Sequence, residues 1–146
     1  MNSVDNVALL RLRREGQRLT AGRQALLETL AEAGRPMTIP MILQVRPSLA
    51  QSSVYRNLSV LQSAGLVTRI ALGDDHAHFE LSEELTGEHH HHTVCTECGA
   101  VTPVTLADAI EAKLVKSLTA ATEPARFRVT GHRLDVLGVC AACASA

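Results

Sequence analysis

The chain of 146 residues has no tryptophan, one tyrosine and two phenylalanines. It also lacks any apolar run near the roughly 20 residues that a membrane-spanning helix requires, and its first thirty residues contain no apolar signal-peptide core. These absences exclude a transmembrane helix, so we expect a cytoplasmic protein with no membrane partner. Hydrophobic residues are nonetheless 46% of the chain, and its core must therefore be packed from aliphatic side chains.

Cysteine occurs four times, in two C-x-x-C pairs, Cys95/Cys98 and Cys140/Cys143. Each pair presents two thiolates on one tight turn, and two such turns brought together form a tetrahedral four-thiolate zinc site. Two disulfides or a redox dithiol are the alternatives, but a reducing compartment favours zinc. The spacing therefore predicts a structural Zn²⁺ bound by all four cysteines.

The net charge of −1 conceals two halves of opposite sign. Residues 1–72 carry nine arginines against four acidic residues, whereas residues 73–146 carry five basic residues against eleven acidic ones and contain all seven histidines. A basic half suits phosphate and an acidic, His- and Cys-rich half suits cations, as a metal-responsive nucleic-acid binder would need. Considered alone, the asymmetry is better explained by chance segregation of surface charge.

Helix signals follow one another through the basic half. Thr20 caps a helix that stops at Gly34, and Thr38 starts a short helix that Pro47 ends. A third helix begins near Leu49 and stops at Gly65. Residues 66–70 and 76–81 read as strands joined by a turn over 72–75. Three helices followed by a β-hairpin predict a winged helix.

The third helix of such a module enters the major groove of double-stranded DNA. Its exposed face places a tyrosine beside an arginine among serines, a pattern that suits contacts with phosphates and base edges. Two further arginines flank the start of the first of these three helices, where phosphate contact and a solvated side chain are about equally expected. The candidate DNA contacts are Arg18, Arg23, Ser52, Ser53, Tyr55 and Arg56.

Five segments together resemble the ferric uptake regulator (Fur) superfamily of bacterial metal-dependent repressors, including its zinc-responsive Zur-like members. They are TAGRQALLETL, SSVYRNLSVLQSAGLVTR, HFEL, HHHHTVCTECGAV and GHRLDVLGVCAAC. The resemblance implies an α+β protein, with a winged-helix DNA-binding domain over residues 1–83 and a metal-binding α/β dimerisation domain over 84–146. The alternation of residues 100–104 and 127–139 around a helical stripe over 106–118 supports the second domain independently.

The resemblance also implies three metal sites. The four cysteines form the structural zinc site. A third site comprises His89, His91, Glu111 and His132. A hinge site that senses metal comprises Glu80, His90 and His92. Successive side chains of an extended segment point to opposite faces, so one run of four histidines can serve two sites.

Two departures from the family pattern bear on the hinge. Residues 34–37 lack the histidine that many iron-type members supply, and residues 82–88 make the hinge longer than usual. His76 and His78 share a strand face with Glu80 and offer replacement ligands.

We expect a homodimeric, zinc-responsive repressor that binds operator DNA and is not an enzyme. Nitrogen-rich sites suit both Zn²⁺ and Fe²⁺, so an iron-responsive or peroxide-sensing member of the family is the alternative. A zinc hydrolase and a zinc-stabilised interaction module are alternatives of other classes.

Overall fold

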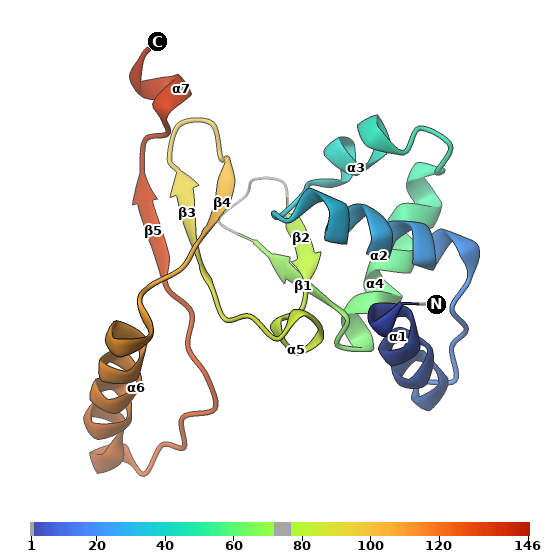
Figure 1. Ribbon diagram of the computed structural model, residues 1–146. Helices are drawn as coiled ribbons and strands as arrows, with labels where there is room; N and C mark the ends of the chain where they lie inside the picture. Colours follow the sequence, from blue (N-terminus) through green and yellow to red (C-terminus); the bar gives the residue numbers. More distant parts are fainter. Residues whose placement is uncertain (1, 72–76) are drawn as a thin grey trace. The chain divides into compact units, whose positions relative to one another are not determined.

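The computed structural model describes residues 2–71 and 77–146, which divide into two compact units, Met1–Glu88 and His89–Ala146. Figure 1 shows the elements of both. The expected division after residue 83 falls at the start of α5 (Glu83–Thr86). The predicted turn over residues 72–75 and the candidate ligand His76 lie outside the described residues.

The first unit contains the predicted helices. They are α2 (Ala21–Ala33), α3 (Ile39–Val45) and α4 (Gln51–Ser63). The Thr20 and Thr38 side chains accept hydrogen bonds from the backbone N–H groups of Arg23 and Met41, so the caps expected from sequence start α2 and α3. Gly34 ends α2 in the left-handed conformation at φ 59°.

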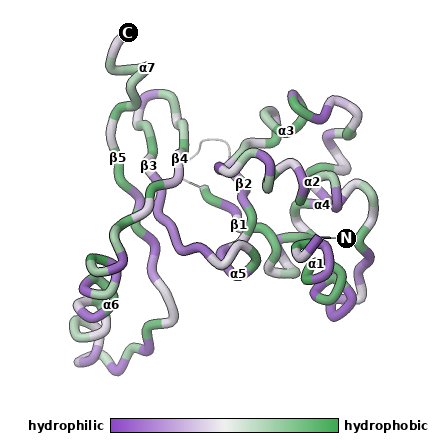
Figure 2. Tube along the Cα trace, viewed as in Figure 1, coloured by the Kyte–Doolittle hydropathy of each residue, from purple (hydrophilic) through white to green (hydrophobic). Residues whose placement is uncertain are grey.

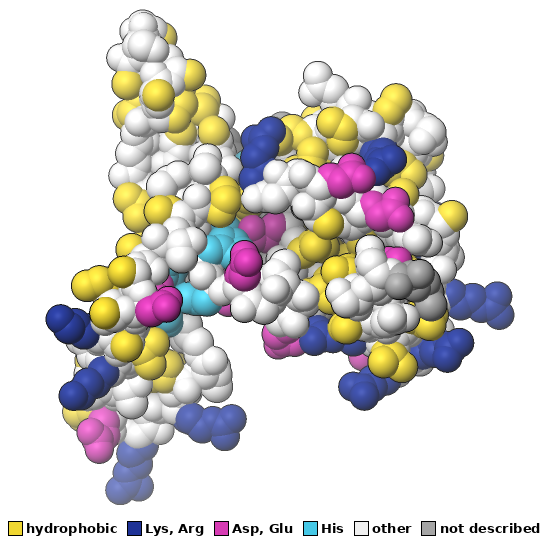
Figure 3. Space-filling view, in the orientation of Figure 1, with side chains coloured by type: hydrophobic (Ala, Val, Ile, Leu, Met, Phe, Trp, Pro, Cys, Tyr) yellow, Lys and Arg dark blue, Asp and Glu magenta, His cyan; other side chains and the backbone are white. Residues whose placement is uncertain are grey.

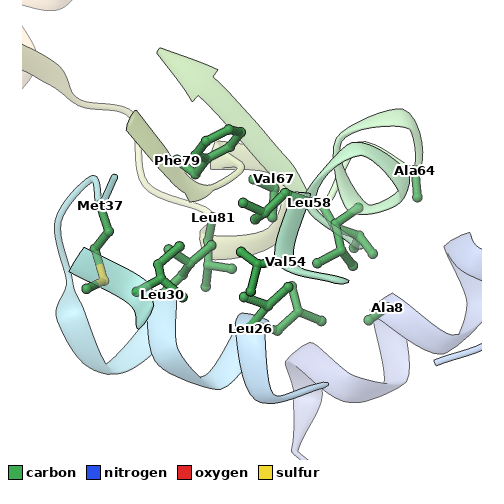
Figure 4. Close-up of a cluster of buried hydrophobic side chains, with 14 of the residues drawn as sticks. Ala8, Leu26, Leu30, Met37, Val54, Leu58, Ala64, Val67, Phe79 and Leu81 are labelled. Atoms are coloured by element: carbon green, nitrogen blue, oxygen red, sulfur yellow. The ribbon is translucent and has the colours of Figure 1, made fainter. Parts of the chain in front are cut away.

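The hairpin of the winged helix follows α4. Strands β1 (Val67–Ile70) and β2 (His78–Leu81) are antiparallel, with Val67 opposite Leu81 and Ile70 opposite His78. Buried aliphatic side chains from the helices pack against this hairpin in one cluster (Figure 4). The core is therefore aliphatic as predicted, with Phe79 from β2 as its aromatic member.

Helix α1 (Ser3–Arg14) precedes the elements predicted from sequence. It begins with a capping box between Asn2 and Asp5. At its other end, Arg11 donates a 2.8 Å hydrogen bond to the Gly65 carbonyl and forms a 2.9 Å ion pair with Glu84. These contacts attach α1 and α5 to the turn after α4.

The second unit is a small sheet with one long helix. Strand β3 (His91–Cys95) lies between antiparallel β4 (Val101–Val104) and parallel β5 (Asp135–Gly138). Helix α6 (Asp108–Thr122) and a 3₁₀ turn, η1 (Glu123–Ala125), separate β4 from β5, and α7 (Ala141–Ala144) follows.

The strand predicted over residues 127–139 is shorter than expected and covers Asp135–Gly138. Its neighbour β3 begins at His91, and the register pairs His92 with Asp135. Among the described residues, 127–134 have no neighbouring strand, so the alternating pattern there has no ladder to join.

Candidate metal centres and nucleic-acid surface

The four cysteines converge in the second unit. Cys95 ends β3, and Cys98 lies in the turn that follows. Cys140 is the N-cap residue of α7, and Cys143 lies within that helix. Their four Sγ atoms lie within 4.8 Å of one another, and all four are free cysteines. The Sγ atoms of Cys98 and Cys140 are 3.7 Å apart. Two sulfurs on a tetrahedral zinc at about 2.3 Å would be about 3.8 Å apart, whereas a disulfide bond is about 2.0 Å long.

Backbone N–H groups donate hydrogen bonds that favour a thiolate in this cluster. The N–H groups of Cys140 and Cys98 donate to the Cys95 Sγ at 3.3 and 3.5 Å. Hydrogen bonds from the backbone of Cys140, Cys98 and Glu97 lower the pKa of Cys95 to about 6. Hydrogen bonding with the sulfurs of Cys140 and Cys98, together with burial, raises the pKa of Cys143 to about 12. One thiolate forms readily while another needs added positive charge, which a bound dication supplies.

A second cluster joins the histidine run to α6 and to the segment before β5. The ligand atoms of its four residues, His89, His91, Glu111 and His132, lie within 4.8 Å of one another. The Nε2 atoms of His89 and His132 are 3.2 Å apart, and His132 Nε2 is 3.1 Å from Glu111 Oε2. Two nitrogens bound to one tetrahedral zinc at about 2.0–2.1 Å would be about 3.3 Å apart, so the imidazoles are spaced as metal ligands are.

Glu111 is the anionic member of this cluster, and it contacts His91 as well as His132. Burial raises the pKa of Glu111, but the hydrogen bond and charge of His91 and the charge of His89 outweigh it, so the pKa lies below its ordinary value. His91 is 1% exposed. Three imidazoles and a carboxylate suit a first-row divalent metal such as zinc or iron. Histidine side chains gather at one place on this unit (Figure 3).

The other two histidines of the run, His90 and His92, lie together on the opposite face of the extended segment. The rings of His90 and His92 are 4.9 Å apart between centroids, as those of His89 and His91 are 4.8 Å apart. His92 is buried beside Asp135, with 3.9 Å between Nδ1 and Oδ1. The run therefore alternates as its extended conformation predicts.

The remaining predicted hinge ligands belong to the first unit. His78 and Glu80 alternate along β2, are both half-buried, and face Ile70 and Thr68 across the hairpin. A shared metal between Glu80 and the two histidines of the second unit stays a prediction.

The predicted recognition helix, α4, divides into a buried and an exposed face. Val54, Leu58 and Leu61 are buried, while Tyr55 is 57% exposed and Arg56 is exposed beside it. Ser52 and Ser53, at the helix start, are exposed too. A tyrosine, an arginine and two hydroxyls thus form a polar surface of the kind that contacts DNA phosphates and bases.

The two arginines near the start of α2 have different environments. Arg18 is exposed, as a phosphate contact requires. Arg23 is only 9% exposed, and its guanidinium donates hydrogen bonds to the Arg18 carbonyl and to Asn57 Oδ1. Sequence reasoning missed Asn57, because an asparagine within a recognition helix carries no signal of a partner 34 residues away.

Comparison with known proteins finds relatives that match most of the chain. The model of the Ferric uptake regulator family matches residues 14–136. The chain is 30% identical to the ferric uptake regulation protein of Legionella pneumophila, over 90% of this chain and 95% of that protein. It is 29% identical to the peroxide-responsive repressor PerR of Staphylococcus aureus, over 90% and 86%.

A solved structure of the Vibrio cholerae ferric uptake regulator has the same fold. It superposes with a TM-score of 0.69 at 29% identity, over 88% of this chain and 96% of that one. The family model spans the winged helix and most of the second unit. The chain therefore belongs to the ferric uptake regulator family.

Proposed function

We propose that this chain is a homodimeric, metal-dependent transcriptional repressor that binds double-stranded operator DNA in response to zinc. The observation that carries the proposal is the presence, in one chain, of a winged helix with an exposed Tyr55–Arg56 pair and two clusters of metal-binding residues. Each supports one half of the function, since the first suits DNA and the second suits a divalent cation.

A second copy of the chain is the partner that the second unit supports. All fifteen residues of α6 retain exposure in one copy, and none is buried. Figure 2 shows hydrophobic residues recurring along α6 and β5, and β5 is an edge strand. Exposed apolar residues on an edge strand and a helix favour a symmetric interface. Those residues are Ile110 and Val115 on α6, Val136 and Leu137 on β5, and Val139 directly after β5.

Regulation rests on the ligands predicted in the hinge. Glu80 on the wing side, with His78 beside it, and His90 and His92 on the strand side would hold the regulatory ion. A bound Zn²⁺ would supply one positive centre that attracts all of these side chains. With both sets of ligands engaged, the two recognition helices of a dimer would keep one separation, suited to successive major grooves. Without them, DNA binding carries the cost of ordering the hinge.

Zinc is our first choice of sensed metal, and iron is the second. A sensing site rich in imidazole suits Zn²⁺ over Mn²⁺, but it also accepts Fe²⁺. The similarity to a peroxide-responsive repressor supports an iron-dependent, peroxide-sensing alternative.

Neither a zinc hydrolase nor an interaction module requires DNA binding, so DNA binding separates the repressor from both. Among the described residues, no helix is both long and apolar enough to cross a membrane. A cytoplasmic location accords with a DNA-binding role.

The proposal is tested by native mass spectrometry followed by selection of DNA. Mass spectrometry of zinc-loaded protein should give a dimer with at least one tightly bound zinc per chain. The same protein should enrich a palindromic duplex from a random-sequence library, and a chelator that removes the weaker zinc should release it. A failure to enrich any duplex with zinc, iron or manganese would contradict the DNA-binding role.

A further inference from the structure

Arg23 is a charged side chain that the first unit buries. It is the third residue of α2, where Thr20 caps the helix by accepting a hydrogen bond from the Arg23 backbone N–H. Its exposed fraction is 9%, unlike that of Arg18 nearby, which is exposed. Burying a guanidinium is unfavourable unless its N–H groups find acceptors inside the protein, so its position indicates specific partners.

Those partners connect two segments. The Arg23 Nη1 donates to the Arg18 carbonyl at 2.6 Å, and its Nε donates to Asn57 Oδ1 at 3.2 Å. Asn57 belongs to α4, directly after Arg56 and two residues after Tyr55. The fixed fork of one guanidinium thus links the segment before α2 to the recognition helix.

The helices also approach each other closely at this point. A Cβ atom added to Gly22 would lie 3.1 Å from Asn57 Nδ2. Any side chain at position 22 would therefore press on the Asn57 amide. Glycine before Arg23 leaves the amide in place, with its oxygen available to the guanidinium.

The apolar contacts of α4 do not by themselves fix how the helix is rotated. Val54, Leu58 and Leu61 hold it against the core, but burial of apolar surface is non-directional. Side-chain ends lie about 5–6 Å from a helix axis, so a rotation of about 20° would move them by about 2 Å. Hydrogen bonds to bases or phosphates tolerate much less, because their lengths span only about 2.7–3.2 Å.

We propose that Arg23 is a positioning residue for operator recognition, which acts by holding Asn57 and hence the rotation of α4, rather than by contacting DNA. The Gly22–Arg23–Asn57 contact orients the exposed Tyr55 and Arg56. This inference rests on the proposed DNA-binding function. It assigns to Arg23 a role that depends on the shape of the guanidinium, whereas a phosphate contact would depend mainly on its charge.

The experiment compares Arg23→Lys, Arg23→Gln, Asn57→Ala and the Arg23→Gln/Asn57→Ala double variant with the parent. The probe is the duplex selected by zinc-loaded protein, and affinity is measured by fluorescence anisotropy at several salt concentrations. Arg18→Gln is the matched control for loss of an exposed charge. Zinc content and dimer mass are checked for every variant.

The positioning role predicts that all three single variants bind about tenfold or more weakly, with the salt dependence of the parent. Lysine should not rescue, since an ammonium keeps the charge but lacks the guanidinium fork. The double variant should bind about as weakly as each single variant, because both remove one contact. Parental affinity in Arg23→Lys or Asn57→Ala would overturn the proposal. So would a salt slope reduced by about one per subunit in Arg23→Gln, which indicates a phosphate contact.

A second measurement does not require DNA. Amide hydrogen exchange in the free dimer should become faster over Gln51–Ser63 in Arg23→Gln and Asn57→Ala, and stay unchanged over α6. If the parent binds no duplex but α4 responds in this way, the proposed function fails while the contact between Arg23 and α4 stands. Unchanged exchange in α4 would overturn the contact itself.

Discussion

Removal of metal from the four-cysteine site should unfold the second unit while leaving the first one folded. The physical reason is a difference between the two cores. In the second unit, all of whose residues are described, the buried apolar side chains are Val94, Cys95 and Val101. The first unit buries a continuous cluster that draws on every one of its helices from α1 to α4.

The magnitude follows from these buried residues. Fully burying an aliphatic side chain contributes about 1.5–3 kcal/mol, so Val94 and Val101 together contribute on the order of 3–6 kcal/mol before any ordering cost, and Cys95 belongs to the metal site itself. Zinc binding to small structural sites contributes about 10–16 kcal/mol at pH 7. Zinc binding therefore contributes more to the stability of this unit than its apolar core does. Loss of one of the four zinc ligands should remove most of the zinc contribution.

The assay is the two-dimensional amide NMR spectrum of the parent, Cys98→Ser and the matched control Glu97→Ser, each with zinc content measured. Glu97 is exposed in the same turn. In Cys98→Ser, the signals of residues 89–146 should collapse to unfolded positions while those of the first unit persist. The control should keep its zinc and its spectrum. A Cys98→Ser protein that has lost its zinc but retains a dispersed second unit would refute the reasoning.

Three further predictions concern DNA contacts, sensing and protons. Arg56→Ala and Tyr55→Phe should weaken binding to the selected duplex by about 1–3 kcal/mol per lost contact, and a symmetric dimer loses each contact twice. The zinc content should stay unchanged. If both variants bind with the affinity of the parent, neither residue belongs to the DNA interface. His92→Ala should abolish zinc-activated DNA binding in a dimer that keeps its cysteine-bound zinc. His91→Ala should chiefly lose the metal that it would share with Glu111 on α6. Identical behaviour of the two variants would contradict the alternation of the histidine side chains between two sites. The pKa of Cys95, lowered to about 6, leaves this thiol ionised at pH 7.5, so zinc should bind there without releasing its proton. Below about pH 6 a proton on Cys95 competes with zinc, so the affinity of the site for zinc should fall more steeply with falling pH. Calorimetry in buffers of different ionisation enthalpy measures the number of protons that zinc binding releases at each pH.

Local signals in the sequence predicted much of the first unit. Thr20 and Thr38 carry cap chemistry that does not depend on distant residues, and both start helices where expected. The apolar spacing of α4 likewise predicts its buried face. Helix α1 was missed, although its capping box and the spacing of Ala8 and Leu12 carried a usable signal.

Properties that depend on distant partners could not be predicted from local patterns. Alternation over residues 127–134 suggested a strand, but a strand forms only where a neighbour offers a ladder, and β3 begins too late to do so. Arg23 and Arg18 look alike in sequence, yet one is buried because Asn57 lies within reach. The convergence of the four cysteines was predictable because two C-x-x-C pairs have the ligand spacing that tetrahedral zinc sites require.

The most direct test of the account is the affinity of the dimer for its selected duplex as a function of free zinc, with the four-cysteine zinc retained throughout. Native mass spectrometry of each sample reports that zinc. We predict that affinity rises by at least about tenfold as a second class of zinc site fills, and that His92→Ala abolishes the rise. Equal affinity with and without that second zinc would contradict metal-dependent DNA binding by this protein.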